Sequence, residues 1–73
     1  MGLSVKAKDM VKFLKENGFW IKRTTSHHIL TNGVRTVPVS RHDNEDLKLG
    51  TLNGILTSAN LKRADLEQWM GRC

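Results

Sequence analysis

Apolar residues near the start of the chain recur at helical spacing, and they predict a first helix from about Val5 to Glu16. The residues that set this period are Ala7, Met10, Val11 and Leu14. Ser4 is placed to cap the helix at its N-terminus. Asn17-Gly18 is expected to end it, because glycine reaches positive φ without a Cβ clash.

Three strands are predicted next. Phe19 to Thr24 is aromatic and β-branched at its start, and Trp20 is interpreted as core or rim packing. The other two strands, near His27 to Thr31 and Val34 to Val39, are separated by Asn32-Gly33. That dipeptide is typical of a two-residue type I′ turn, in which both central residues need positive φ.

A turn at Asn32-Gly33 would pair Thr31 with Val34 and His27 with Pro38. Since side chains alternate between faces, one face would carry His28, Leu30, Val37 and Val39, and the other His27, Ile29, Thr36 and Pro38. The first set suits packing against helices, so His27 is expected to point outward. Pro38 has no N–H to donate, which favours an edge position for the third strand.

The rest of the chain reads as a polar connector and two helices. Residues 41–46 have no apolar period and are expected to form a solvated loop. Leu52, Ile55, Leu56 and Ala59 predict a helix that starts near Gly50-Thr51 and ends near Asn60. A short third helix would bury Leu61, Leu66, Trp69 and Met70 and expose Asp65 and Glu67. The prediction is one α+β domain over residues 1–73, with helix, three strands, helix and a short extra C-terminal helix.

Charge divides the chain into two unequal halves. The net charge is +5, and residues 1–41 hold eight Lys/Arg against two Asp/Glu, whereas residues 42–73 hold four against five. A basic half beside a near-neutral half is typical of a surface that contacts a polyanion such as nucleic acid. A merely solvated basic face is the alternative.

Several classes of protein are disfavoured by composition. The chain has no glycine-rich phosphate loop, so it is not expected to be a nucleotide-driven enzyme. No small-molecule cofactor is expected either. Its one cysteine, Cys73, forms no internal disulfide and no CxxC metal site, which fits a reducing cytosol. With no apolar run of signal-peptide or membrane-span length, a cytoplasmic protein without membrane contact is expected.

His27 is the first candidate for chemistry. Histidine has an ordinary pKa of about 6.5, so it can take a proton from a ribose 2′-hydroxyl near neutrality, and nearby cations can offset phosphoryl charge. The alternative, which is the commoner case for a histidine in a strand, is that His27 has a structural role and no chemical one.

A zinc site from His27, His28, His42 and Cys73 matches no standard ligand spacing. A DNA-binding helix-turn-helix around Asn60 is disfavoured, because its last helix would present the carboxylates of Asp65 and Glu67 to the DNA phosphates.

The whole pattern resembles the HicA family of mRNA interferase toxins over roughly residues 5 to 61. The resemblance is carried by Ser26-His27-His28, the Asn32-Gly33 hairpin, Val37-Pro38-Val39 and the segment Lys48-Leu49-Gly50-Thr51-Leu52. It implies a fold like that of double-stranded-RNA-binding domains, α-β-β-β-α, and an antitoxin, HicB, that occludes the site. Thr25 stands where the family has glycine, and threonine resists positive φ, which favours a differently shaped loop or weaker activity.

The resemblance implies a toxin of a type II toxin–antitoxin system that cleaves mRNA without a metal. His27 is then the catalytic residue, and Lys22, Arg23, Ser26, Arg35 and Arg41 are candidates for binding RNA. A non-catalytic RNA-binding module of the same fold is one alternative. A scaffold protein whose basic face binds an acidic partner is another.

Overall fold

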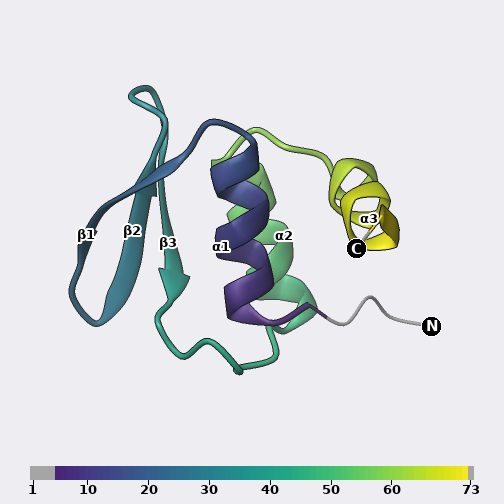
Figure 1. Ribbon diagram of the computed structural model, residues 1–73, viewed down its shortest axis with the longest axis horizontal. Helices are drawn as coiled ribbons and strands as arrows, with labels where there is room; N and C mark the ends of the chain where they lie inside the picture. Colours follow the sequence, from purple (N-terminus) through teal and green to yellow (C-terminus); the bar gives the residue numbers. More distant parts are fainter. Residues whose placement is uncertain (1–4, 73) are drawn as a thin grey trace.

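The computed structural model describes residues 5–72 and places three strands on one side of the molecule and three helices on the other (Figure 1). The elements in chain order are α1 (Ala7–Glu16), β1 (Trp20–Thr24), β2 (His27–Thr31), β3 (Thr36–Ser40), α2 (Leu49–Ser58) and α3 (Arg63–Arg72). The predicted α+β order, including the extra C-terminal helix, is confirmed.

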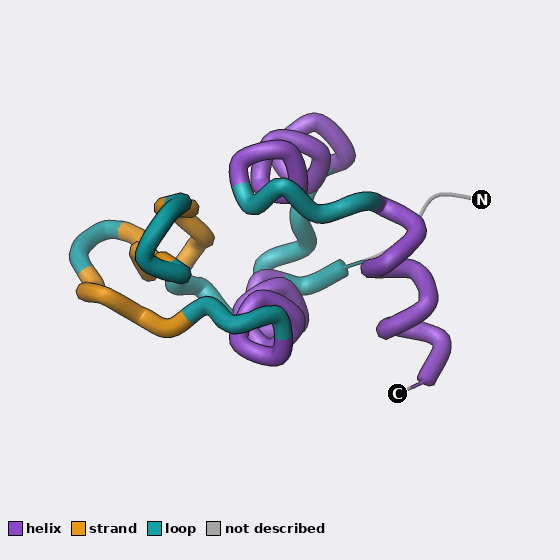
Figure 2. The backbone as a smooth tube through the Cα atoms, turned by 90° about the horizontal axis from the view of Figure 1, so that it is seen from above, coloured by secondary structure: helices purple, strands orange, loops and turns teal. Residues whose placement is uncertain are grey.

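The three strands form one antiparallel sheet in the order β1-β2-β3. Figure 2 shows α1 and α2 on the same side of the sheet, so that one face is covered and the other is open. Leu30, Val37 and Val39 point into the covered face and are at most 1% exposed. They pack with Met10, Phe13 and Leu14 of α1 and with Leu52, Ile55 and Leu56 of α2. Most of the apolar residues that the periodicity indicated lie in this core, while Val11, Leu61 and Met70 are partly buried against it.

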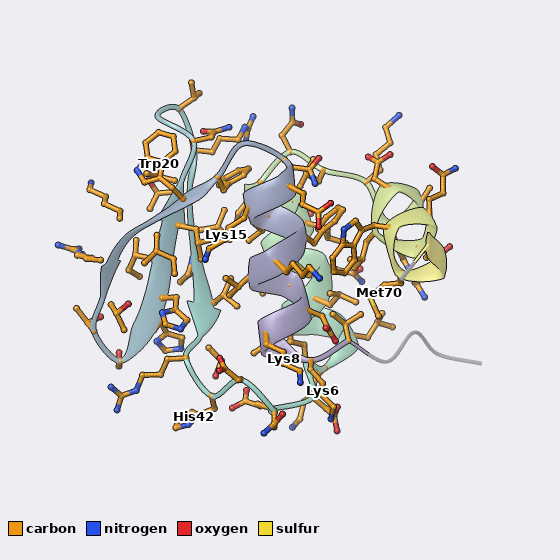
Figure 3. The ribbon with its side chains drawn as sticks, in the orientation of Figure 1. Lys6, Lys8, Lys15, Trp20, His42 and Met70 are labelled. Carbon is orange, nitrogen blue, oxygen red and sulfur yellow. The ribbon has the colours of Figure 1, made fainter. Side chains whose placement is uncertain are left out.

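The connector before α2 caps the first helix. The Ala7 N–H donates to the carbonyl of Glu45 at 2.9 Å and the Lys8 N–H to that of Asp43 at 3.1 Å. These bonds satisfy helix N–H groups that have no partner within the helix. The charged side chains of the connector are exposed, as expected (Figure 3). Its backbone carbonyls, however, accept hydrogen bonds from the start of α1. The N-cap of α1 is Lys6, and the predicted cap Ser4 lies outside the described residues. The helix ends at Glu16 and is followed by Asn17 and by Gly18, whose φ is +88°.

The register of the β2–β3 hairpin differs from the prediction by two residues. Thr31 pairs with Thr36 and His27 with Ser40, so the turn is centred on Gly33-Val34 instead of Asn32-Gly33. Gly33 has φ of +92°, whereas Asn32 has no positive φ and accepts the N–H groups of Val34 and Arg35 on Oδ1 at 2.9 and 2.7 Å. The asparagine side chain therefore builds the turn. A two-residue slip preserves both faces, so the predicted face assignment is correct.

Trp20 is not a core residue. Its side chain is 52% exposed, while its neighbours Phe19 and Ile21 face the core. A bulge between Ile21 and Arg23 then shifts the register of β1 against β2. The pairing of Trp20 with Thr31 puts the indole on the open face. The apolar character of Phe19 and Trp20 does not by itself show which of the two faces the core.

The last two helices follow the predicted pattern, except that Leu61 precedes α3 and that Leu61 and Met70 are only partly buried. Asn60 ends the α2 region with φ of +59°, a conformation that asparagine tolerates better than most residues. In α3, Leu66 is fully buried and Trp69 is 4% exposed, and the Trp69 ring lies 5.6 Å from that of Phe13 in α1. Asp65 and Glu67 are exposed. The helix closes the core from the side opposite the sheet (Figure 1).

Candidate nucleic-acid interface

His27 is the first residue of β2 and its side chain is exposed on the open face of the sheet. The strand begins just after a tight connection from β1, in which the Thr25 N–H donates to the His27 carbonyl at 2.9 Å. Ser40, the last residue of β3, lies directly opposite His27. The sequence prediction that His27 points outward is consistent with its place beside Ile29 and across from Ser40 on this face.

One nitrogen of the His27 ring has a partner within the connection. Nδ1 lies 3.2 Å from Oγ of Ser26. When Nδ1 carries the hydrogen it donates to the hydroxyl, and Nε2 keeps its lone pair free to accept a proton. Ser26 can therefore hold the imidazole in the tautomer that a general base requires.

His28 has the same kind of Nδ1 contact to a hydroxyl as His27, but it differs in burial and in the face of the sheet on which it lies. Its side chain is half-buried on the covered face, and its Nδ1 lies 2.9 Å from Oγ1 of Thr24 on β1. Thr24 and His28 are paired residues of the β1–β2 ladder. Because this contact joins two strands, we interpret His28 as a residue that stabilises the sheet.

A groove of about 520 Å³ runs between the sheet and α2, and His27 lines it. The other lining residues come from β3, the connector and α2: Pro38, Ser40, Glu45, Leu47, Thr51, Gly54, Ile55 and Ser58. A larger hollow of about 670 Å³ lies between α1 and α3, remote from His27. Carboxylates of Glu16 and Asp65 line that hollow and would repel phosphate.

The predicted cationic residues surround this region without meeting at one point. Arg41 follows β3 and its Nη1 donates to the Thr25 carbonyl at 3.3 Å, beside the connection that holds Ser26 and His27. Arg35 lies at the other end of β3, where Nη1 donates to the Ser58 carbonyl of the groove at 3.4 Å. Lys22 and Arg23 are exposed on β1. Arg41 is thus beside His27, and Arg35 is at the far end of the groove.

Of the residues that line the groove, only His27 was a predicted site residue, and Ser40 and Glu45 are two unforeseen ones that contact each other. The Ser40 hydroxyl donates to Oε1 of Glu45 at 3.2 Å and accepts the His42 N–H at 3.2 Å. Glu45 thereby brings a carboxylate close to a surface that would bind phosphate. No sequence signal indicated this contact, because it depends on the corrected β3 register and on the folded connector.

The three strands and the two connections between them carry no carboxylate. Residues 17–42 include Lys22, Arg23, Arg35 and Arg41 but no Asp or Glu. The ion pairs found within residues 5–72 join Lys6 to Asp46 and Arg63 to Glu67, so they neutralise none of these four cations. A polyanion approaching the open face meets only positive or neutral side chains until it reaches Glu45.

Metal and membrane sites are not found in the described part of the chain. Over residues 5–72, no cluster of three or more His, Cys, Asp or Glu side chains is arranged to hold a metal ion. Cys73, which the zinc alternative required, lies outside the described residues. None of the helices in the same range is long and apolar enough to cross a bilayer.

The fold and the site together define a small α+β domain with an open, basic sheet face and an exposed histidine beside a groove. A family model described as "HicA toxin of bacterial toxin-antitoxin" matches residues 7–66. The chain belongs to this family, which confirms the resemblance seen in the sequence. No curated protein and no solved structure matches the chain.

Proposed function

We propose that this HicA family toxin is a metal-independent endoribonuclease that cleaves mRNA in the cytoplasm, with His27 as its general base. The observation that carries the proposal is the setting of His27: exposed, hydrogen-bonded through Nδ1 to Ser26, and at the edge of a groove beside an acid-free basic sheet. The HicB-type antitoxin expected as its partner would inhibit it by covering this groove.

The reaction needs a proton acceptor and positive charge. Nε2 of His27 takes the proton of a ribose 2′-hydroxyl, and the oxygen attacks the adjacent phosphorus as the bond to the 5′-oxygen breaks. The leaving 5′-oxygen takes a proton from water, and the protonated His27 returns its proton to the resulting hydroxide, so atoms and charge balance. Arg41 is near enough to the Ser26-His27 connection to offset charge on the phosphoryl oxygens, while Lys22, Arg23 and Arg35 hold the strand on either side.

A non-catalytic module that binds duplex RNA is less consistent with the charge distribution. The segment before α2 exposes Asp43, Glu45 and Asp46, which would repel phosphates there. Competition between duplex and single-stranded RNA in a gel-shift titration separates the two functions. A strong duplex preference without cleavage would favour the binding module.

Cleavage of single-stranded RNA in excess chelator tests the nuclease. His27→Gln is expected to lower the cleavage rate by about 100- to 10,000-fold, the usual contribution of a general base. His28→Gln is the matched control, since its ring contacts Thr24 on the covered face. Undiminished cleavage by His27→Gln, with both variants folded by circular dichroism, would contradict the assignment of His27.

Arrest of bacterial growth on expression of the chain gives an independent test of the toxin. His27→Gln should relieve the arrest at equal protein levels, whereas His28→Gln should retain it. Relief by both variants would point to lost folding instead of lost chemistry. Failure of the parent chain to arrest growth would favour the scaffold alternative.

A further inference from the structure

Trp20 is an aromatic residue on the same open face as His27, and neither the core nor the proposed chemistry uses it. It is directly opposite Thr31 in the ladder, and His27 is four residues before Thr31 on β2. With about 3.3 Å per strand residue and about 4.8 Å between strands, the two Cα atoms are roughly 14 Å apart. Ile29 lies between them on the same face, opposite Pro38 of β3.

The indole lies near the β2–β3 turn at its far end and is half exposed. A Cβ built on Gly33 would lie 3.7 Å from Cη2 of Trp20, so the far end of the ring approaches the β2–β3 turn. Figure 3 shows Trp20 beside that turn, well away from α3. The side chain is nevertheless 52% exposed. A half-exposed indole beside the turn offers a flat apolar surface.

The charged residues around Trp20 indicate which class of ligand this surface can bind. Lys22 and Arg23 follow it on β1, and residues 17–42 contain no Asp or Glu. Exposed aromatic rings among cations suit nucleic-acid bases, because the ring stacks on the base while the cations neutralise the phosphates. An apolar protein partner would gain nothing from the cations.

We propose that Trp20 stacks on an unpaired base of single-stranded RNA whose backbone runs along the open sheet face toward His27. This inference rests on the proposed function, because it assigns part of the same substrate. It also restricts the substrate class. A base can stack on Trp20 only when it is free of its helix, so a duplex is excluded from this position.

The fluorescence of Trp20 gives a direct readout. The chain has two tryptophans, and Trp69 is 4% exposed, so Trp69→Phe leaves Trp20 as the sole and exposed emitter. Adding His27→Gln keeps the RNA intact. A mixed-sequence single-stranded oligoribonucleotide should quench this emission with saturation. The same sequence as a duplex, and poly-L-glutamate as a polyanion without bases, should quench it weakly or not at all.

Binding measured by anisotropy of a labelled oligoribonucleotide provides the second readout. Trp20→Leu should weaken binding by about 5- to 150-fold, the effect of losing one stacked base, and Trp20→Phe should retain most of the affinity. Leu49→Ala is the matched control, because Leu49 is equally exposed at 53% but lies on α2. Circular dichroism confirms that the variants are folded.

The outcomes separate this inference from the nuclease. Binding without quenching, unchanged affinity of Trp20→Leu, or quenching by poly-L-glutamate but not by RNA would overturn it, and cleavage by the parent chain would still stand. Quenching by single-stranded RNA without cleavage would support it and contradict the nuclease. No RNA binding at all would overturn both.

Discussion

Ser26 Oγ lies 3.2 Å from Nδ1 of His27, so the residue immediately before the candidate base also orients it. Ser26→Ala removes this contact and leaves the ring free to adopt either tautomer. A hydrogen bond of this kind contributes about 0.5–1.5 kcal/mol, so we expect cleavage to fall by about 2- to 12-fold. The rate constant at saturating RNA should carry the loss.

Ser26→Thr is the control for this prediction, because it keeps a hydroxyl at the same position. It should retain most of the activity. If Ser26→Ala instead weakens RNA binding at an unchanged rate constant, Ser26 contacts the substrate and does not position His27.

Thr25 stands where the resemblance to the family implies a glycine, and its backbone conformation gives a sharper expectation than the sequence alone. Among the non-glycine residues of the described chain, only Asn60 has positive φ, so Thr25 adopts a conformation that threonine accepts. Thr25→Gly should therefore give no gain in cleavage. It should destabilise the domain by about 0.4–1 kcal/mol through added freedom of the unfolded chain.

Urea unfolding of Thr25→Gly measures the stability change, and the cleavage assay in chelator measures the activity. A large rise in cleavage by Thr25→Gly would mean that the threonine side chain obstructs the substrate. The loop shape would then limit the cleavage rate, as the resemblance to the family implied.

The face assignment of the hairpin could be predicted from the sequence, while its register could not. Leu30, Val37 and Val39 are apolar at alternate positions, and burial of one face fixes that alternation whatever the turn. The turn itself depended on Asn32 using its side chain instead of positive φ. Both options are open to an Asn-Gly pair.

The position of His27 on the open face followed from the same alternation, but the groove beside it did not. Its far wall comes from Thr51, Gly54, Ile55 and Ser58 of α2, more than twenty residues away in the chain. Glu45 enters through its contact with Ser40, five residues earlier, in a connector whose sequence has no periodic pattern. Local patterns place residues on faces, whereas contacts between distant segments depend on how the core packs.

Gly54 lies in α2 and also lines the groove, so one substitution there should change both the stability of the domain and its affinity for RNA. It lies in α2, and a Cβ added there meets no atom within 4 Å, so Gly54→Ala should stabilise the domain by about 0.5–1 kcal/mol. Because Gly54 also lines the groove beside His27, the added methyl group should reduce the affinity for RNA. Thermal unfolding and anisotropy titration measure the two effects.

Gly50→Ala is the matched control for Gly54→Ala. Gly50 is in the same helix and has equally open surroundings, but it does not line the groove. It should raise stability by a smaller amount, since it lies in the first turn, and leave RNA affinity unchanged. Equal RNA affinities for both variants would show that RNA does not enter the groove at Gly54.

The basic face makes a quantitative prediction about salt. Each phosphate neutralised on a single strand contributes a slope of about −0.7 to the dependence of log affinity on log salt concentration. Arg41→Gln should reduce the steepness of this slope by about 0.7, because Arg41 lies beside the connection that holds His27 and pairs with no carboxylate in the described residues. Arg63→Gln should not change it, because Arg63 pairs with Glu67 on α3 at 3.2 Å. A slope for Arg41→Gln equal to that of the parent chain would remove Arg41 from the RNA contacts and move the phosphate path toward Arg35 and the β1 cations.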